Sequence, residues 1–155
     1  MNIREYQHVD QNRILELVKR MADFDQPEWR QKEEIVAGDQ KMLEKYFSGH
    51  LSDGKLFVAE SLDKILGFIF LELRNDFFNN DRVVHVCVLA VDEGATGKGV
   101  GSTLMKFAES YAQQNDVGQM TLNVFKANLG AQTLYKKLGY QEEIISMIKK
   151  IDLED

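Results

Sequence analysis

The stretch GATGKGVGST, residues Gly94–Thr103, lies between an apolar run and a helical pattern, and its first eight residues include four glycines. Glycine tolerates backbone conformations that other residues avoid, so a glycine-rich turn at a helix start can direct N–H groups towards an anion. The stretch therefore predicts a phosphate-binding loop, in which Lys98 adds a positive charge. A flexible loop that is simply rich in glycine is the alternative.

Two well-known phosphate motifs do not fit this loop. A Walker A loop needs four residues between its first glycine and a Gly-Lys pair that Ser or Thr follows. Here two residues separate Gly94 from Gly97, and Gly99 follows Lys98. The dinucleotide motif would need a glycine at Ser102, and it would follow the first strand of its domain rather than roughly the fourth. What remains is a row of alternating glycines that opens a helix.

The rest of the chain predicts one α/β domain over residues 1–155 with a mixed sheet. Apolar residues recur with helical spacing in some segments and alternate in others. The run at 83–91 is almost continuously apolar, which indicates a central strand covered on both faces. In chain order we expect a strand at 2–7, a helix from Asp10, a helix at about 28–50, strands at 55–60, 65–75 and 83–91, a helix from Val100, a strand at 119–125, a helix at about 131–138, and a strand at 140–151.

Composition narrows the class of protein. The chain has 155 residues, of which 44% are hydrophobic and 28% charged, and no run approaches the ~18 apolar residues of a membrane span. The start of the sequence lacks the apolar core of a signal peptide, and the lone Cys87 fits a reducing cytoplasm. The net charge of −6 argues against nucleic acid as the main partner. The three histidines, His8, His50 and His85, are scattered along the sequence and offer no metal site.

Two motifs together resemble the GNAT superfamily of N-acetyltransferases. The glycine loop is similar to that family's acyl-CoA pyrophosphate loop, Q/R-x-x-G-x-G/A, although Thr96 stands where Gln or Arg is usual. The second motif, N-x-x-A-x-x-L-Y-x-x-x-G-[FY], is matched without a gap by Asn128, Ala131, Leu134, Tyr135, Gly139 and Tyr140. The expected order of elements agrees with the family along nearly the whole chain.

This resemblance implies a mixed, mostly antiparallel sheet of six to seven strands flanked by about four helices, with strands 83–91 and 119–125 splayed apart. Acetyl-CoA would bind in that opening and pair its pantetheine arm with the backbone of Leu89 and Val91. Asn128 would contact the cofactor, cap the helix that follows it, or do both. The pyrophosphate would lie on the loop formed by Thr96, Gly97, Lys98, Gly99, Val100, Gly101 and Ser102.

The resemblance also implies direct attack of a neutral amine on the thioester, without a covalent enzyme intermediate. Tyr135 would protonate the leaving thiolate, and simple packing in the apolar stripe of its helix is its alternative role. The base would be His85, at a position where some members carry a glutamate, or Glu72 on the preceding strand, or water. The alternative for His85 is a purely structural role as a buried, hydrogen-bonded histidine. The alternative for Glu72 is an exposed carboxylate without a catalytic role. Cys87 fits a small buried apolar residue better than a nucleophile.

The acceptor is an amine that the sequence leaves undefined. In this family the first two helices and their connection usually line the acceptor side, and a cationic amine suits aromatic and acidic side chains. The residues so implied are Phe24, Asp25, Glu28 and Trp29. A solvated loop is their alternative. Small molecules and peptides both remain open as acceptors, as does a homodimer through the last strand. A non-catalytic acyl-CoA-binding sensor or interaction module is the alternative function.

Overall fold

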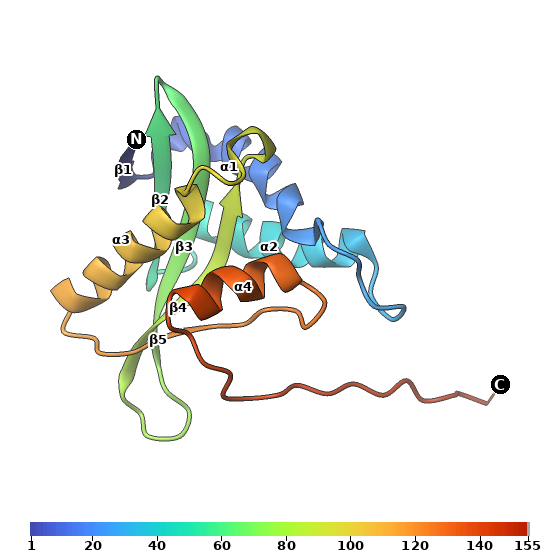
Figure 1. Ribbon diagram of the computed structural model, residues 1–155. Helices are drawn as coiled ribbons and strands as arrows, with labels where there is room; N and C mark the ends of the chain where they lie inside the picture. The colour runs from blue at the N-terminus through green and yellow to red at the C-terminus, as the bar shows by residue number, and fades with distance from the viewer. Residues whose placement is uncertain (155) are drawn as a thin grey trace.

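A five-stranded mixed sheet is the middle layer of the computed structural model, which describes residues 1–154 (Figure 1). The strands lie in the order of the chain, so each pairs with its sequence neighbours. The first three pairings are antiparallel, and the pairing of the last two strands is parallel. The strands are β1 (Asn2–Glu5), β2 (Gly54–Ser61), β3 (Lys64–Asn75), β4 (Arg82–Val91) and β5 (Met120–Leu122).

Helices cover both faces of the sheet. In Figure 1, α3 (Val100–Gln114) and α4 (Leu129–Lys137) lie in front, and α1 (Gln11–Leu17) and α2 (Lys32–Phe47) lie behind. Short 3₁₀ turns at His8–Asp10 and Val18–Ala22 extend α1 at both ends, where the sequence predicts one longer helix. A reciprocal capping box between Gln31 and Glu34 starts α2 later than the predicted residue 28.

A bulge in β4 divides the hydrophobic core between the two faces. The pairing with β3 shifts so that Leu71 faces Val86 and Phe70 faces Val88, which leaves Cys87 as the extra residue. Val86 therefore packs with α3, whereas Val88 packs with α1 and α2. The bulge turns side chains near the middle of β4 to new directions, and bulges often lie beside functional sites.

One glycine brings α3 close to the sheet. A Cβ atom on Gly67 of β3 would lie 2.8 Å from the carbonyl oxygen of Ala90 and 3.2 Å from the Cγ1 atom of Val100. Both distances are shorter than ordinary van der Waals contact, so only glycine leaves room there for the helix. The start of α3 is thereby placed directly over β3 and β4.

The end of the chain differs from the prediction. The described residues form five strands rather than six to seven. The predicted strand at 119–125 pairs only over Met120–Leu122, and the predicted strand at 140–151 is extended but unpaired. Figure 1 shows this segment leaving the end of α4 and running away from the body. A strand needs a neighbour to satisfy its backbone N–H and C=O groups, and this segment has none within the described chain.

Candidate active site

The predicted phosphate loop, residues 94–103, follows β4 and runs into α3. Gly97 and Gly99 have φ angles of +79° and +78°, in the left-handed region that glycine adopts without strain. No side chain caps α3, and the first backbone bond along it joins the Thr103 N–H group to the Gly99 carbonyl oxygen at 3.0 Å. The N–H groups of residues 100–102 therefore lack an intrahelical acceptor and can bind an anion.

The loop also has room and positive charge for a phosphate group. A Cβ atom at Gly97 or Gly99 would meet no atom within 4 Å, so the surface above both glycines is open. Lys98 is exposed and forms no ion pair within residues 1–154. These features fit a pyrophosphate better than they fit a flexible loop.

Arg20 is a second cation at the loop, and no sequence motif marked it. It lies at the end of the 3₁₀ turn after α1, where its Nη2 group is 3.4 Å from the Thr96 hydroxyl and its Nε group donates to the Val91 carbonyl oxygen at 3.2 Å. It also forms an ion pair with Asp23. An arginine from a distant turn thus stands beside Thr96, the position where the related motif usually has Gln or Arg.

The edge of β4 beyond residue 86 is open. β5 pairs with β4 only at Val84↔Met120, His85↔Thr121 and Val86↔Leu122, and the two strands separate after these pairs. The half-buried residues Leu89 and Val91 lie on the part of β4 that continues towards the glycine loop. The end of pairing after Val86 confirms the predicted splay of the two strands. The unpaired edge of β4 can offer its N–H and C=O groups to an extended ligand.

Two motif residues on α4 have defined surroundings. The Oδ1 atom of Asn128 accepts a hydrogen bond from the Ala131 N–H group at 3.2 Å, so Asn128 is the N-cap of α4. Tyr135 is half-buried, and its ring packs edge-on against Tyr140 with 5.9 Å between centroids. Burial raises the pKa of the Tyr135 phenol, which keeps the hydroxyl protonated and able to donate.

Both candidate bases lie in one row across three strands. Glu72 on β3 is the register partner of His85 on β4, and His85 is the partner of Thr121 on β5. The Nδ1 atom of His85 and the Thr121 hydroxyl are hydrogen-bonded at 2.8 Å, and Arg74 Nε donates to Glu72 at 2.6 Å. Because Val84 and Val86 point towards α3, His85 points to the face that α1 and α2 cover.

The environment of His85 keeps its imidazole neutral. The residue is 8% exposed, and burial lowers its pKa to about 4, with a smaller contribution from the charge of Arg74 and an opposing one from Glu72. At neutral pH the ring is therefore an uncharged hydrogen-bonding group. Its conjugate acid is stronger than that of ordinary histidine, so His85 accepts a proton less readily than the sequence analysis assumed.

A partly buried acidic residue on α2 faces the same region. Asp39 lies three residues after Val36 and four before Leu43, both of which pack on the sheet, so it shares their side of the helix. Burial raises its pKa to about 6. The pKa of the Cys87 thiol is raised to about 12, by burial first and then by the charges of Glu72 and Asp39, which keeps the thiol protonated at neutral pH.

The four predicted acceptor contacts separate into two groups. Phe24 reaches the body, where its ring lies 5.4 Å from that of Phe125, just after β5. Asp25, Glu28 and Trp29 are exposed on the connection between α1 and α2, with Trp29 45% accessible. Figure 1 shows this connection projecting from the body. The structure thus brings Phe24 to the end of β5 and leaves the other three in solvent.

No group of three or more His, Cys, Asp or Glu side chains within residues 1–154 is arranged to hold a metal ion. None of the described helices has the length and apolar character that crossing a membrane requires.

Comparisons with known proteins agree with this geometry. The chain is 28% identical over 143 residues to the uncharacterized N-acetyltransferase YhfO of Bacillus subtilis (strain 168), covering 92% of this chain and 91% of that protein. It is 27% identical over 99 residues to a mycothiol acetyltransferase of Renibacterium salmoninarum, where the match spans 64% of this chain and 28% of the relative.

Solved structures show the same fold. A putative acetyl transferase from Pyrococcus furiosus superposes with a TM-score of 0.77 at 22% identity, covering 97% of this chain and 99% of that one. The aminoglycoside 6'-N-acetyltransferase AAC(6')-IG from Acinetobacter haemolyticus gives a TM-score of 0.68 at 18% identity, with 98% and 100% covered.

A mixed sheet whose last two strands run parallel and separate after three residue pairs, together with an uncapped helix after a glycine loop, is typical of the acetyltransferase class of α/β enzyme. Residues 16–140 match the Acetyltransferase (GNAT) family, and the chain belongs to that family as an N-acetyltransferase. Membership implies the use of an acyl-CoA donor.

Proposed function

We propose that this enzyme transfers the acetyl group of acetyl-CoA to the nitrogen of an amine by direct attack within a ternary complex. The observation that carries the proposal is the uncapped start of α3, where two left-handed glycines expose backbone N–H groups beside the open edge of β4. A helix N-terminus with free N–H groups binds phosphate, and an open strand edge binds extended amides.

The donor would span these two sites. The pyrophosphate would lie on the N–H groups of Gly97 and of residues 99–102, since the Lys98 N–H group already donates to the Ala95 carbonyl oxygen at 3.2 Å. The side chains of Lys98 and Arg20 would add positive charge beside it. The pantetheine arm would follow β4 past Val91 and Leu89. Asn128 keeps its Oδ1 atom on the α4 N-terminus, so only its amide NH₂ group remains for contact with the donor.

The chemistry needs two proton transfers. The amine nitrogen forms a bond to the thioester carbonyl carbon, and the carbon–sulfur bond then breaks. The protonated Tyr135 hydroxyl would donate its proton to the leaving sulfur, for which its half-buried position and raised pKa are suitable. The proton on the attacking nitrogen would leave through Glu72 or His85, directly or through water. The low pKa of His85 makes it a poor final acceptor, so His85 would act as a neutral relay to Glu72 or to water.

The acceptor would enter from the face that α1 and α2 cover. Two carboxylates, Glu72 and Asp39, and the paired rings of Phe24 and Phe125 belong to this side. Carboxylates together with aromatic faces favour a positively charged ligand. We therefore propose a small amine that carries a second cationic group, with Asp39 rather than Asp25 or Glu28 as its acidic contact.

The test is release of CoA thiol from acetyl-CoA with a panel of amines and a no-amine control. Diamines and polyamines should turn over with lower KM than monoamines of the same length. The Asp39→Asn variant should raise KM for diamines at least fivefold and leave KM for monoamines unchanged. Equal KM values for both classes in the wild type would contradict the proposed acceptor. Acetyl-CoA binding without turnover of any amine would favour the non-catalytic module.

A further inference from the structure

A charged pair holds the point at which β4 becomes the glycine loop. Arg13 on α1 donates from its Nη2 group to the Oδ1 atom of Asp92, the first residue after β4, at 2.9 Å. Both side chains are partly buried, with 25% and 24% of their surface exposed. The two residues lie 79 positions apart in the sequence, so the pair ties a distant helix to the start of the loop.

Both members of the pair are also bound to the first residues of β3. The Nε and Nη2 groups of Arg13 donate to the Ile65 carbonyl oxygen at 3.3 and 3.2 Å, and the Asp92 N–H group donates to the Leu66 carbonyl oxygen at 2.7 Å. The Nη1 group of Arg13 pairs with Glu16, one turn further along α1, at 3.1 Å. Each guanidinium nitrogen therefore has an acceptor, which gives the side chain one defined position.

Asp92 transmits this position into the loop. Its carbonyl oxygen accepts a hydrogen bond from the Ala95 N–H group at 2.9 Å, and its Oδ2 atom lies so close to Gly94 that a Cβ atom there would be 3.2 Å away. The pKa of the Asp92 carboxyl is lowered, first by the hydrogen bond from Arg13 and, among smaller causes, by the Gly94 N–H group. One aspartate thus connects α1 to the first turn of the loop.

A second arginine holds the neighbouring residue from the same side. Arg20 lies seven residues after Arg13, about two helical turns, and its Nε group donates to the Val91 carbonyl oxygen at 3.2 Å. The two arginines therefore bind consecutive residues, Val91 and Asp92, at the junction of β4 and the loop. Of the two, only Arg20 also reaches the loop residue Thr96, at 3.4 Å, whereas the contacts of Arg13 end at the junction.

We propose that Arg13 and Asp92 are positioning residues for the acyl donor, which hold the glycine loop in its anion-binding conformation before the donor arrives. An unrestrained glycine-rich loop has many conformations, and the cost of ordering it would be subtracted from the binding free energy. The pair removes part of that cost without touching the donor. The inference rests on the proposed function, because it assumes that the donor pyrophosphate lies on this loop.

Titration calorimetry with acetyl-CoA is the first test. Arg13→Met should raise the Kd about tenfold, because the loop must then be ordered on binding. Arg4→Met is the matched control, since Arg4 on β1 is 23% exposed and also binds two carboxylates, Asp10 at 2.8 Å and Glu60 at 3.1 Å. Its Kd should stay within about twofold of the wild type, because a general loss of stability is all that it causes. Equal Kd values for Arg13→Met and the wild type would overturn the inference.

A double-mutant cycle tests whether the two residues act as one unit. Asp92→Ala should also raise the Kd, and Arg13→Met/Asp92→Ala should bind no more weakly than the weaker single variant, because partners in one interaction are not additive. Fully additive losses would show two independent effects and would contradict a shared positioning role.

A donor without the pyrophosphate separates positioning of the loop from general damage. S-acetylpantetheine has the thioester and the pantetheine arm alone, so Arg13→Met should leave its kcat/KM within about twofold of the wild type. With acetyl-CoA the same variant should raise KM and leave kcat unchanged. Equal losses of kcat/KM with both donors would indicate a general structural role and would overturn the inference.

Hydrogen exchange of the protein without ligand tests the loop independently of the donor. The N–H groups of Ala95, Thr96 and Lys98 form backbone hydrogen bonds of 2.9 to 3.2 Å within the loop. Their exchange should become about tenfold faster in Arg13→Met, because the loop opens locally, and should stay unchanged in Arg4→Met. Unchanged exchange in Arg13→Met would overturn the inference even where acetyl-CoA binds. Faster exchange in a protein that does not bind acetyl-CoA would support the brace and reject the proposed donor.

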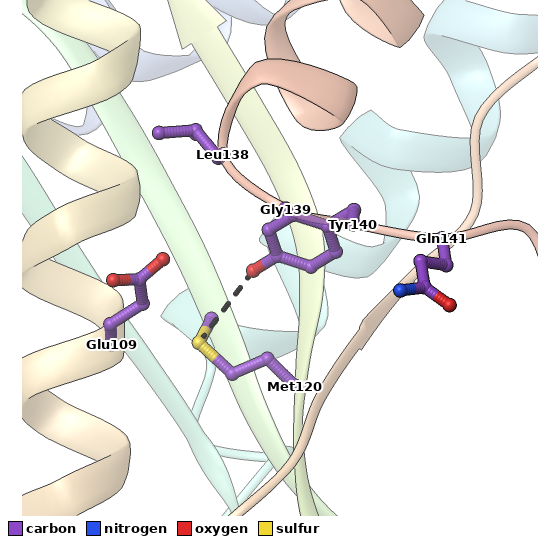
Figure 2. Close-up of a pocket in the computed structure, with 6 residues that line it drawn as sticks. All are labelled: Glu109, Met120, Leu138, Gly139, Tyr140 and Gln141. Carbon is purple, nitrogen blue, oxygen red and sulfur yellow. Dashed lines mark hydrogen bonds between the residues drawn. The ribbon is translucent and has the colours of Figure 1, made fainter.

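A further control lies on the helix that the loop opens. Figure 2 shows Glu109 of α3 beside a hollow of about 380 Å³ that Met120 and Tyr140 also line. Glu109→Gln removes a carboxylate from α3 about two turns beyond the loop and should change neither the exchange of the loop nor the Kd for acetyl-CoA. A change as large as that in Arg13→Met would show that the loop responds to any altered charge on its neighbours, which contradicts a specific role of the pair.

Discussion

At the scale of single residues, the site depends on side chains whose protonation is set by burial. Tyr135 keeps its proton because burial raises its pKa, and His85 stays neutral because burial lowers its pKa to about 4. The same physical cause acts in opposite directions, since burial always disfavours the charged form. In the proposed reaction, the neutral Tyr135 phenol would donate a proton to the leaving sulfur, and the neutral imidazole of His85 would relay the proton of the amine.

Replacement of Tyr135 by Phe should lower kcat about 100-fold and leave the Kd for acetyl-CoA within twofold, because only the proton donor is lost. Tyr140→Phe is the matched control, since its hydroxyl contacts only the Met120 sulfur within the described chain. Its kcat should stay within threefold of the wild type. Steady-state thiol release and calorimetric binding provide both numbers. Equal kcat values for the two variants would remove Tyr135 from the proposed chemistry.

The acid dependence of stability should report His85 and Asp39 with opposite signs. His85 binds its proton more weakly when folded, so its contribution is complete above about pH 6.5 and is lost as the pH falls towards 4. Because the His85 ring is only 8% exposed, its lowered pKa corresponds to a stability contribution of roughly 3 kcal/mol. Asp39 binds its proton more tightly when folded, so its contribution is present below pH 3.8 and is lost as the pH rises through about 6.

Urea unfolding of variants between pH 4 and 6.5 separates the two groups. Relative to the wild type, His85→Gln should lose less stability on acidification, because the destabilising histidine is gone. Asp39→Asn should lose more, because the opposing carboxylate is gone. Parallel pH curves for both variants and the wild type would show that neither group is buried as described.

At the scale of elements, three neighbouring segments position the glycine loop. The end of β4 leads into it, α3 leaves it, and the turn after α1 supplies Arg20 to Thr96 and Val91. The loop itself was predictable, because four glycines before a helical pattern are a local signal. Arg20 was not, because it lies 76 residues before Thr96 and no local pattern marks it.

Removal of the Arg20 charge should weaken acetyl-CoA binding three- to tenfold in Arg20→Ala, since one cation beside the pyrophosphate is lost. Lys19→Ala removes the same charge from an exposed neighbour and should leave the Kd unchanged. The difference between the variants should shrink as salt rises, because solvent ions screen a partly exposed pair. Isothermal titration at two ionic strengths measures the Kd for acetyl-CoA of both variants. A salt-independent loss would indicate a change in loop structure instead.

Glycine substitutions should separate close packing from helix propensity. Gly67→Ala should lower the free energy of unfolding by about 1–3 kcal/mol, because its Cβ would lie 2.8 Å from the Ala90 carbonyl oxygen under α3. Gly38→Ala, in α2, meets no atom within 4 Å and should raise it by up to about 1 kcal/mol. Denaturant unfolding provides both values. A neutral Gly67→Ala would mean that α3 can move away from the sheet without cost.

At the scale of the whole molecule, donor binding joins parts that are distant in sequence. The loop, the open edge of β4 and Tyr135 on α4 belong to different segments of the folded chain, so a ligand that touches all three stabilises the folded state alone. Folding and donor binding would therefore be linked in this protein.

Acetyl-CoA at about 100 times its Kd should raise the Tm by roughly 5–10 °C, because a ligand of the folded state adds about 2.7 kcal/mol at that concentration. ATP and NAD at equal concentration should leave the Tm unchanged, since neither has the pantetheine arm that would pair with β4. Scanning calorimetry at fixed protein concentration measures all three. Equal shifts by acetyl-CoA and ATP would assign the loop to a general phosphate site.

The sequence alone determined the features that depend on residues close together along the chain. The four glycines, the motif from Asn128 to Tyr140 and the apolar periods were sufficient for the family, the α/β fold and most element positions. An acidic residue between Val36 and Leu43 was also a readable signal for Asp39. Only the tertiary structure decided the bulge at Cys87, the row of Glu72, His85 and Thr121, and the unpaired segment 141–154. These depend on which strands become neighbours, and strand pairing is a long-range contact that no local pattern specifies.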